Sequence, residues 1–195
     1  MPAIRTGISA TTPQNYLIGP GAVYKDFTDL ATLGTTAKLL GATAGGNQVT
    51  VTPEWFDPRP DGAPGPIKGM RRLIGVTVTA KVNLLEMTKE NLMLALGKAT
   101  SEPYPATTPT HDKIRPSLGT LASTDYFNIA IVGDLGGDTD PVVFVLENVC
   151  VTDAVEINMG TGKEDIVLAV TFTAHYDPAN LEQVPAYILR PQTTP

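Results

Sequence analysis

Alternation of apolar and polar residues between positions 72 and 87 predicts one long β-strand. One face of it carries Val76, Val78, Ala80, Val82 and Leu84, and the other carries Thr77, Thr79, Lys81 and Asn83. Such a strand is typical of an antiparallel sheet that packs one face on a core and leaves the other polar.

A helix is expected directly after this strand, at about 88–97. Thr88 is a suitable N-cap, and Glu90 lies in the first turn, where its charge favours the positive end of the helix dipole. Gly97 is placed to end the helix, which we expect to cover one open face of the sheet. Its apolar stripe is Leu92, Met93 and Leu96.

Shorter apolar segments predict the remaining strands. They lie at 16–27, split by a turn or bulge at Gly19-Pro20-Gly21, at 36–42 and 48–52 as a hairpin, and at 126–132, 142–159 and 164–176. Turns are expected at 45–47, 133–138 and 160–162. The count is seven to eight strands and one helix.

Proline and glycine interrupt this pattern in two long stretches. Regular structure is not expected in 53–71, which holds five prolines, because proline lacks the amide donor and fixes φ. Residues 98–124 form a second long loop, and 1–15 and 177–195 are extended terminal arms. The predicted fold is one mainly β domain over 1–195, a sandwich or barrel of antiparallel strands with a single α-helix.

The composition indicates a surface that is covered by neighbours. Only 17% of the residues are charged, although a free monomer normally exposes about 25–35% charged residues on its surface. The single cysteine, Cys150, excludes an intrachain disulfide and lies in an apolar run, where a buried structural thiol is expected.

Charge is distributed unevenly along the chain. Residues 59–115 carry nine basic and five acidic groups, a formal charge of +4, whereas residues 116–165 carry one basic and nine acidic groups, a charge of −8. Opposite blocks of this kind can steer head-to-tail association, or they can be solvated loops that differ in sign.

No segment predicts a membrane or secretory destination. The first residues lack the apolar core of a signal peptide, and no apolar run approaches the roughly 18 residues that span a bilayer. We therefore expect no membrane insertion by this chain and synthesis in the cytosol.

The candidate catalytic and metal-binding residues do not form a recognisable set. His111 and His175 have no local partners for a triad or a metal site. A carboxylate pair for glycosidic chemistry, drawn from Glu54, Asp57 or Asp61, is disfavoured because the loop that carries them faces solvent. We expect no catalytic residues and no cofactor.

A hard cation is the alternative left open at one turn. Asp134, Asp138 and Asp140 lie close together among glycines, but their spacing does not fit an EF-hand loop. Aspartate and glycine are also ordinary turn residues, so we expect no metal here.

The candidate contact residues lie mainly in and beside 53–71. Arg59, Lys68, Arg71 and Arg72 form the one basic cluster, which suits an acidic surface on a neighbour better than DNA. The predicted inter-subunit contacts are Trp55, Phe56, Arg59, Asp61, Lys68, Arg71 and Arg72, with Asp134, Asp138 and Asp140 on the acidic side.

The order of motifs between residues 41 and 97 resembles the major tail proteins, or tail tube proteins, of long-tailed bacteriophages (siphophages). The motifs are Gly41-Ala42-Thr43-Ala44-Gly45-Gly46, Asp61-Gly62, Lys68-Gly69, the strand Arg72–Glu86 and the helix Thr88–Gly97. The resemblance covers about a third of the chain closely. The remainder resembles the family in its all-β architecture.

The resemblance implies a structural virion protein without catalysis. Subunits of that family form hexameric rings that stack into a hollow tube, through which viral DNA passes without specific binding. It also implies partners among the tape measure and other tail proteins, a location in the virion tail and assembly in the host cytoplasm. Residues 53–71, 98–124 and the two arms match the segments that reach between subunits and rings.

Two other functions are left open. The sequence also leaves open which strand face lines the channel. An isolated β-sandwich that binds a ligand such as a carbohydrate is one alternative, and a related secretion-tube or tail-completion protein is the other. The lumen candidates are the face with Thr77, Thr79, Lys81 and Asn83 and the face with Asp165, Thr171 and Thr173.

Overall fold

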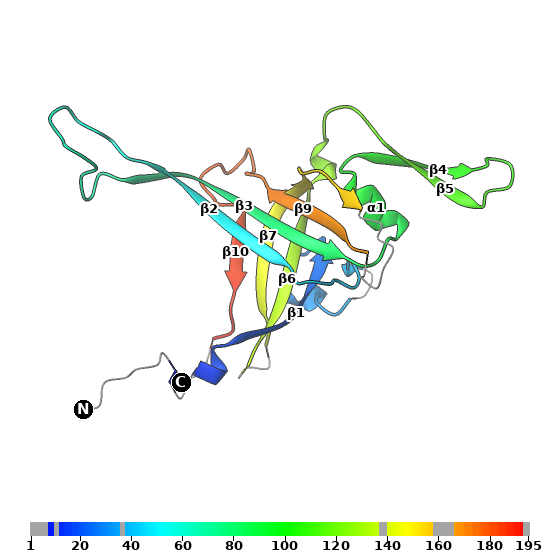
Figure 1. The fold of residues 1–195 in the computed structure, drawn as a ribbon, viewed down its shortest axis with the longest axis horizontal. Coiled ribbons are helices and arrows are strands. Elements are labelled where there is room, and N and C mark those ends of the chain that lie inside the picture. The colour runs from blue at the N-terminus through cyan, green and yellow to red at the C-terminus, as the bar shows by residue number, and fades with distance from the viewer. Residues whose placement is uncertain (1–7, 10–11, 36–37, 137–139, 158–165, 193–195) are drawn as a thin grey trace.

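The computed structural model describes residues 8–9, 12–35, 38–136, 140–157 and 166–192. It is mainly β with one α-helix, as predicted (Figure 1). The strands are β1 (Leu17–Lys25), β2 (Gln48–Phe56), β3 (Arg72–Leu84), β4 (Ala99–Tyr104), β5 (His111–Pro116), β6 (Phe127–Leu135), β7 (Val142–Val151), β8 (Glu156–Ile157), β9 (Leu168–Ala174) and β10 (Ala186–Leu189). The helix α1 spans Lys89–Ala95, and short 3-10 helices lie at Thr12–Gln14, Leu30–Thr32 and Ser123–Asp125.

Strand β7 connects the two halves of the main antiparallel sheet. The strand order is β1-β6-β7-β9-β3-β2, with β10 beside β7 and β8 beside β9. The first half of β7 pairs with β10, and its last residues, Val149–Val151, pair with β9. Asn148, which has a φ of 49°, lies where the pairing partner changes. In the described residues β1 and β2 form the two ends of this order, so the sheet does not close into a barrel.

The main core lies between these two halves. Alternate residues of β3 and β9 are buried, as their sequence pattern predicts: Val78, Ala80, Val82 and Leu84 on β3, and Leu168, Val170, Phe172 and Ala174 on β9. They pack against Val23 of β1, Ile129 and Ile131 of β6, and Leu146 and Val149 of β7. A smaller cluster of Phe27, Ala130, Val143 and Val145 covers the opposite face of β6 and β7.

The helix begins and ends where its capping residues predict. The Thr88 hydroxyl accepts a hydrogen bond from the Asn91 amide at 3.2 Å, and Gly97 follows the C-cap with a φ of +72°. The predicted apolar stripe is wrong in one position, because Leu96 is 38% exposed whereas Asn91 and Ala95 are buried.

None of the helices in the described part of the chain has the length and apolar character that a membrane span requires.

Asn91 is buried because its side chain joins three segments. Its Nδ2 donates to the carbonyl of Leu40 at 2.8 Å and to the carbonyl of Glu86 at 2.9 Å. These two carbonyls belong to the segments that enter the helix region, so one amide group satisfies both of them.

The strand expected at 36–42 is wrong over residues 38–42. Residues 38–43 cross between two strands and make one isolated bridge to each, Leu39 to Tyr24 of β1 and Thr43 to Leu84 of β3. Gly41 allows the crossing, since its φ is +108° and the Glu86 carboxylate lies 2.8 Å from where a Cβ would stand. The same carboxylate accepts a hydrogen bond from the Ala42 amide at 2.9 Å.

Several predicted loops contain strands. Strand β2 continues through Pro53 to Phe56, which is possible because β2 is an edge strand and the missing amide faces no partner. Residues 98–124 contain the β4–β5 hairpin, and the arm at 177–195 contributes β10 to the main sheet. The turn expected at 133–138 begins later, because β6 continues to Leu135.

The other segmentation predictions are mostly confirmed. Strand β1 has its bulge between Ile18 and Ala22, at the predicted Gly-Pro-Gly. The segment 142–159 is broken into β7 and β8. The turn at 160–162 and residue Asp165 lie outside the described residues.

Replacing Asn91 with alanine is expected to lower the free energy of unfolding by about 2–3 kcal/mol, because two inward-facing carbonyls lose their donor. Urea unfolding followed by circular dichroism measures this change. Thr108→Ala, at an exposed loop position, is the control and should change stability by less than about 0.5 kcal/mol. An Asn91→Ala protein as stable as the control would show that these two hydrogen bonds do not hold the helix in place.

Candidate assembly surfaces

The β2–β3 hairpin projects from the body of the molecule (Figure 1). Strand β3 pairs with β9 only over Thr79–Leu84, so residues from Arg72 to Val78 have β2 as their one partner strand. We call residues 53–76 the β2–β3 arm. The arm extends beyond the sheet because β3 is longer than its neighbour β9.

The outer end of the paired strands is held by Arg71. Its guanidinium lies 4.8 Å from the centre of the Trp55 ring and forms an ion pair with Asp57 at 3.2 Å. A cation–π contact with an aromatic ring, together with a carboxylate contact, restricts the orientation of the guanidinium. This contact joins the two ends of the loop 57–71, where it leaves β2 and enters β3.

The arm exposes several large apolar side chains to solvent. Trp55 is 45% exposed, Leu73 is 50% exposed and Ile74 is 59% exposed. The exposed apolar residues on and beside the arm are Val51, Trp55, Phe56, Ile67, Met70, Leu73 and Ile74. Ile74 lies at a bulge, where Glu54 pairs with Gly75 and Trp55 pairs with Leu73. Such an exposed patch on a projecting hairpin is typical of an interaction surface.

An apolar groove of about 540 Å³ lies at the root of the arm. The Tyr176 hydroxyl closes the end of the β3–β9 pairing, since it accepts from the Val76 amide at 3.1 Å and donates to the Val76 carbonyl at 3.2 Å. The apolar residues that line the groove with Tyr176 are Leu73, Ile74, Val76, Leu181 and Val184.

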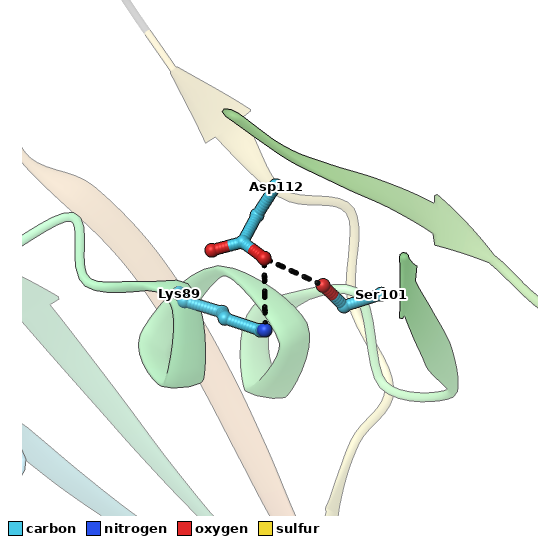
Figure 2. Close-up of polar contacts among 3 residues, drawn as sticks. All are labelled: Lys89, Ser101 and Asp112. Carbon is cyan, nitrogen blue, oxygen red and sulfur yellow. Dashed lines mark hydrogen bonds and ion pairs between the residues drawn. The ribbon is translucent and has the colours of Figure 1, made fainter. Parts of the chain in front are cut away.

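The β4–β5 hairpin forms a second projection, on the other side of the molecule (Figure 1). A two-stranded hairpin is marginally stable alone in water. Here Asp112 of β5 accepts from the Lys89 ammonium of α1 at 2.9 Å and from the Ser101 hydroxyl of β4 at 3.4 Å (Figure 2). One carboxylate therefore fastens both strands of the hairpin to the helix.

The predicted contact residues are only partly brought together. Trp55 and Phe56 lie in β2 and Arg72 lies in β3, where it pairs with Phe56. Arg59, Asp61 and Lys68 are exposed in the loop and form no ion pair with any residue in the described part of the chain. The contribution that sequence patterns missed is apolar, at Leu73, Ile74 and Leu181, and the lack of alternation at 73–74 was its one visible signal.

The predicted acidic cluster lies at another part of the molecule. Asp134 is exposed in β6, where it pairs with Ile18 beside the bulge of β1, and Asp140 is exposed before β7. Asp138 lies outside the described residues. Within those residues, no group of three or more histidine, cysteine, aspartate or glutamate side chains is arranged to hold a metal ion.

The two candidate lumen faces are one surface. Strands β3 and β9 are neighbours, and their register places Thr79 opposite Thr173 and Lys81 opposite Thr171. The Thr173 hydroxyl also lies 2.6 Å from that of Thr152. The polar face of the sheet therefore continues from β2 to β9 with threonine as its main residue: Gln48, Thr50 and Thr52 on β2, Thr77, Thr79 and Lys81 on β3, and Thr171 and Thr173 on β9.

Cys150 is a buried structural thiol, as predicted. Its sulfur lies 3.9 Å from each ring nitrogen of His175, whose ring packs edge-on against Tyr126. Burial raises the pKa of the Cys150 thiol, which disfavours the reactive thiolate.

Comparison with protein-family models and with curated proteins finds no match for this chain. The function of the chain is therefore inferred from its exposed surfaces and from the resemblance of residues 41–97.

Replacing Asp112 with alanine is expected to loosen the β4–β5 hairpin without unfolding the domain. The ion pair is about half exposed, so the global cost should stay below about 1 kcal/mol, while amide hydrogen exchange in β4 and β5 should accelerate. Glu102→Gln is the matched control, because it removes an ion pair with Lys113 inside the hairpin and leaves the helix contact intact. Equal exchange rates in the two variants would contradict the fastening role of Asp112.

Proposed function

We propose that this chain is a structural virion protein, the subunit of a phage tail tube. In this proposal, copies associate into hexameric rings, and the rings stack into a conduit for double-stranded DNA. The observation that carries self-association is the β2–β3 arm, which exposes apolar side chains far from its own core. The ring symmetry and the conduit come from the sequence resemblance.

The free edges of the sheet support a partner that is another copy. Among the described residues, β2 pairs only with β3, and β1 pairs with β6 apart from one bridge at Tyr24. Unpaired backbone donors and acceptors on an exposed edge are a template for a further strand. A contact that joins two different surfaces of identical chains can close into a ring or continue as a filament.

The threonine-rich face suits the wall of a DNA channel. Hydroxyl groups present little charge to phosphates, and Lys81 is the single basic residue in the rows of threonine on β2, β3 and β9. Each lysine or arginine that contacts a phosphate releases a counterion and strengthens adhesion to DNA. A wall with few such residues lets a duplex pass without being held.

Electron microscopy of the purified protein tests this proposal. Hollow tubes or six-fold rings are the expected result. A protein that remains monomeric at high concentration, or one that forms assemblies without a channel, would contradict it.

Replacing residues 58–70 with an Asn-Gly turn between Asp57 and Arg71 is expected to abolish tubes and preserve the fold. The turn is suited to a two-residue hairpin, and the paired part of β2 and β3 is unchanged. Circular dichroism and urea unfolding report the fold, and microscopy reports assembly. The matched control keeps the loop and replaces the exposed Gln48 of β2 with serine, which leaves the arm unchanged and should assemble as the unaltered chain does. Normal tubes from the Asn-Gly variant would show that this loop makes no essential contact.

A further inference from the structure

A polar pocket of about 260 Å³ lies between strands β6 and β7 and the segment that follows β9. Its floor is formed by Asn128, Glu147 and Asn148, which are half-buried, and by the buried Pro185. Its rim is formed by Asp177, Asn180 and Gln183, which are exposed. Six of the seven lining residues are thus carboxylates or carboxamides.

A local break in the sheet creates this pocket. The β6–β7 register shifts between Phe127 and Ile129, and Asn148 adopts a φ of 49°. The Asn128 side chain fills part of the gap, because its Oδ1 accepts from the Asn148 amide at 3.0 Å.

The pocket is negatively charged and holds no cation of its own. Glu147 and Asp177 contribute two carboxylates, and no lysine or arginine is among the lining residues. The Asp177 carboxylate accepts one hydrogen bond, from the Ala179 amide at 2.8 Å, whereas the Glu147 carboxylate forms no hydrogen bond or ion pair within the described residues. Burial, and next the negative charge of Glu147, raise the pKa of Tyr187. A half-buried carboxylate favours a cationic partner.

The chain carries cations of the required kind on its β2–β3 arm. Arg59, Lys68 and Arg72 are exposed and form no ion pair with any described residue, in contrast to Arg71. The arm points away from the body, so its loop is directed away from the domain that carries it (Figure 1). A contact between the loop of the arm and the pocket therefore joins two molecules.

We propose that the pocket of one copy receives the basic side chains of the β2–β3 arm of a second copy. Glu147 and Asp177 accept hydrogen bonds from a guanidinium or ammonium group, and the carboxamides complete its contacts. This inference rests on the proposed self-assembly and identifies the receiving site for the arm.

The surroundings of the pocket match the rest of the arm. The segment that forms its rim also contributes Leu181, Glu182 and Val184 to the groove at the arm root, whose other wall is the base of the same copy's arm, at Leu73, Ile74 and Val76. A polar, anionic site and an apolar groove therefore share one short segment, 177–184. The arm likewise combines basic residues with the apolar side chains of Phe56, Ile67 and Met70. Charge and apolar surface are thus complementary on the two sides.

The test removes the two charges of the pocket and leaves its shape unchanged. We expect the double variant Glu147→Gln, Asp177→Asn to weaken association at least about tenfold in sedimentation velocity, with an unchanged urea unfolding midpoint. The control is Asp153→Asn, Glu156→Gln. It removes two exposed carboxylates elsewhere on the molecule. The Asp153 carboxylate accepts a hydrogen bond from a nearby backbone amide, as the Asp177 carboxylate does. The control should assemble as the unaltered chain does.

A charge exchange keeps the test decisive if one variant is impaired for other reasons. One variant reverses the charge of the pocket, with Glu147→Lys and Asp177→Lys. A second variant reverses the charge of the arm, with Arg59→Glu, Lys68→Glu and Arg72→Glu. Each variant should fail to assemble alone. Their equimolar mixture should assemble, because each arm then meets a pocket of opposite charge. No rescue in the mixture, or normal assembly of the Gln and Asn variant, would overturn the inference.

Two further outcomes separate this inference from the proposed function. Oligomers that depend on Glu147 and Asp177 but never form rings or tubes would support the pocket contact and overturn the proposal that the chain is a tail tube subunit. Calorimetric binding of spermidine that is lost in the Gln and Asn variant, with assembly unaffected, would assign the pocket to a free amine and overturn the inference.

Discussion

The unequal pairing of β3 determines the shape of this molecule. Strand β3 has thirteen residues: Thr79–Lys81 are paired with both β2 and β9, Val82–Leu84 are paired with β9, and the residues before Thr79 have β2 as their one partner strand. The paired part places its even-numbered side chains in the core, and there they are fully buried. Before Thr79 the side chains lose their cover step by step: Val78 is still buried in the core, Val76 is half-buried, and the same alternation leaves Ile74 in solvent.

An arm of this kind is costly for a molecule that works alone. Burying a large aliphatic side chain completely contributes about 1.5–3 kcal/mol, and the arm leaves several such side chains about half exposed. The arm is nevertheless ordered by specific contacts, since Arg71 stacks on Trp55 and Tyr176 bonds the backbone of Val76. A preorganised arm loses less conformational entropy when it docks than a flexible loop would lose. Its order and its exposed apolar surface thus fit a role in association.

The parts of the fold that depend on local patterns were predictable. Alternation located β3 and β9, and Thr88 and Gly97 located the ends of α1, because these signals act within a few residues. Segment 38–42 was not predictable, since it bridges strands that are distant in the sequence. The prediction that proline excludes a strand was wrong at Pro53. Its effect there depends on whether the strand lies at the edge of the sheet, which is a property of the whole sheet.

The candidate site was predictable in its charged residues and not in its geometry. Trp55 and Arg71 could be named from the sequence, but their stacking could not. The two threonine faces could be merged only through the register of β3 with β9. The polar pocket depends on a register shift at Asn128 and an unusual φ at Asn148, neither of which has a sequence signal.

Trp55 offers the most direct measurement, because it is the only tryptophan and lies on the arm. If the arm is covered by another copy, its fluorescence should shift to shorter wavelength and become less accessible to acrylamide as concentration and sedimentation coefficient rise together. Assembly with unchanged Trp55 emission and quenching would contradict the claim that the arm is a contact between copies.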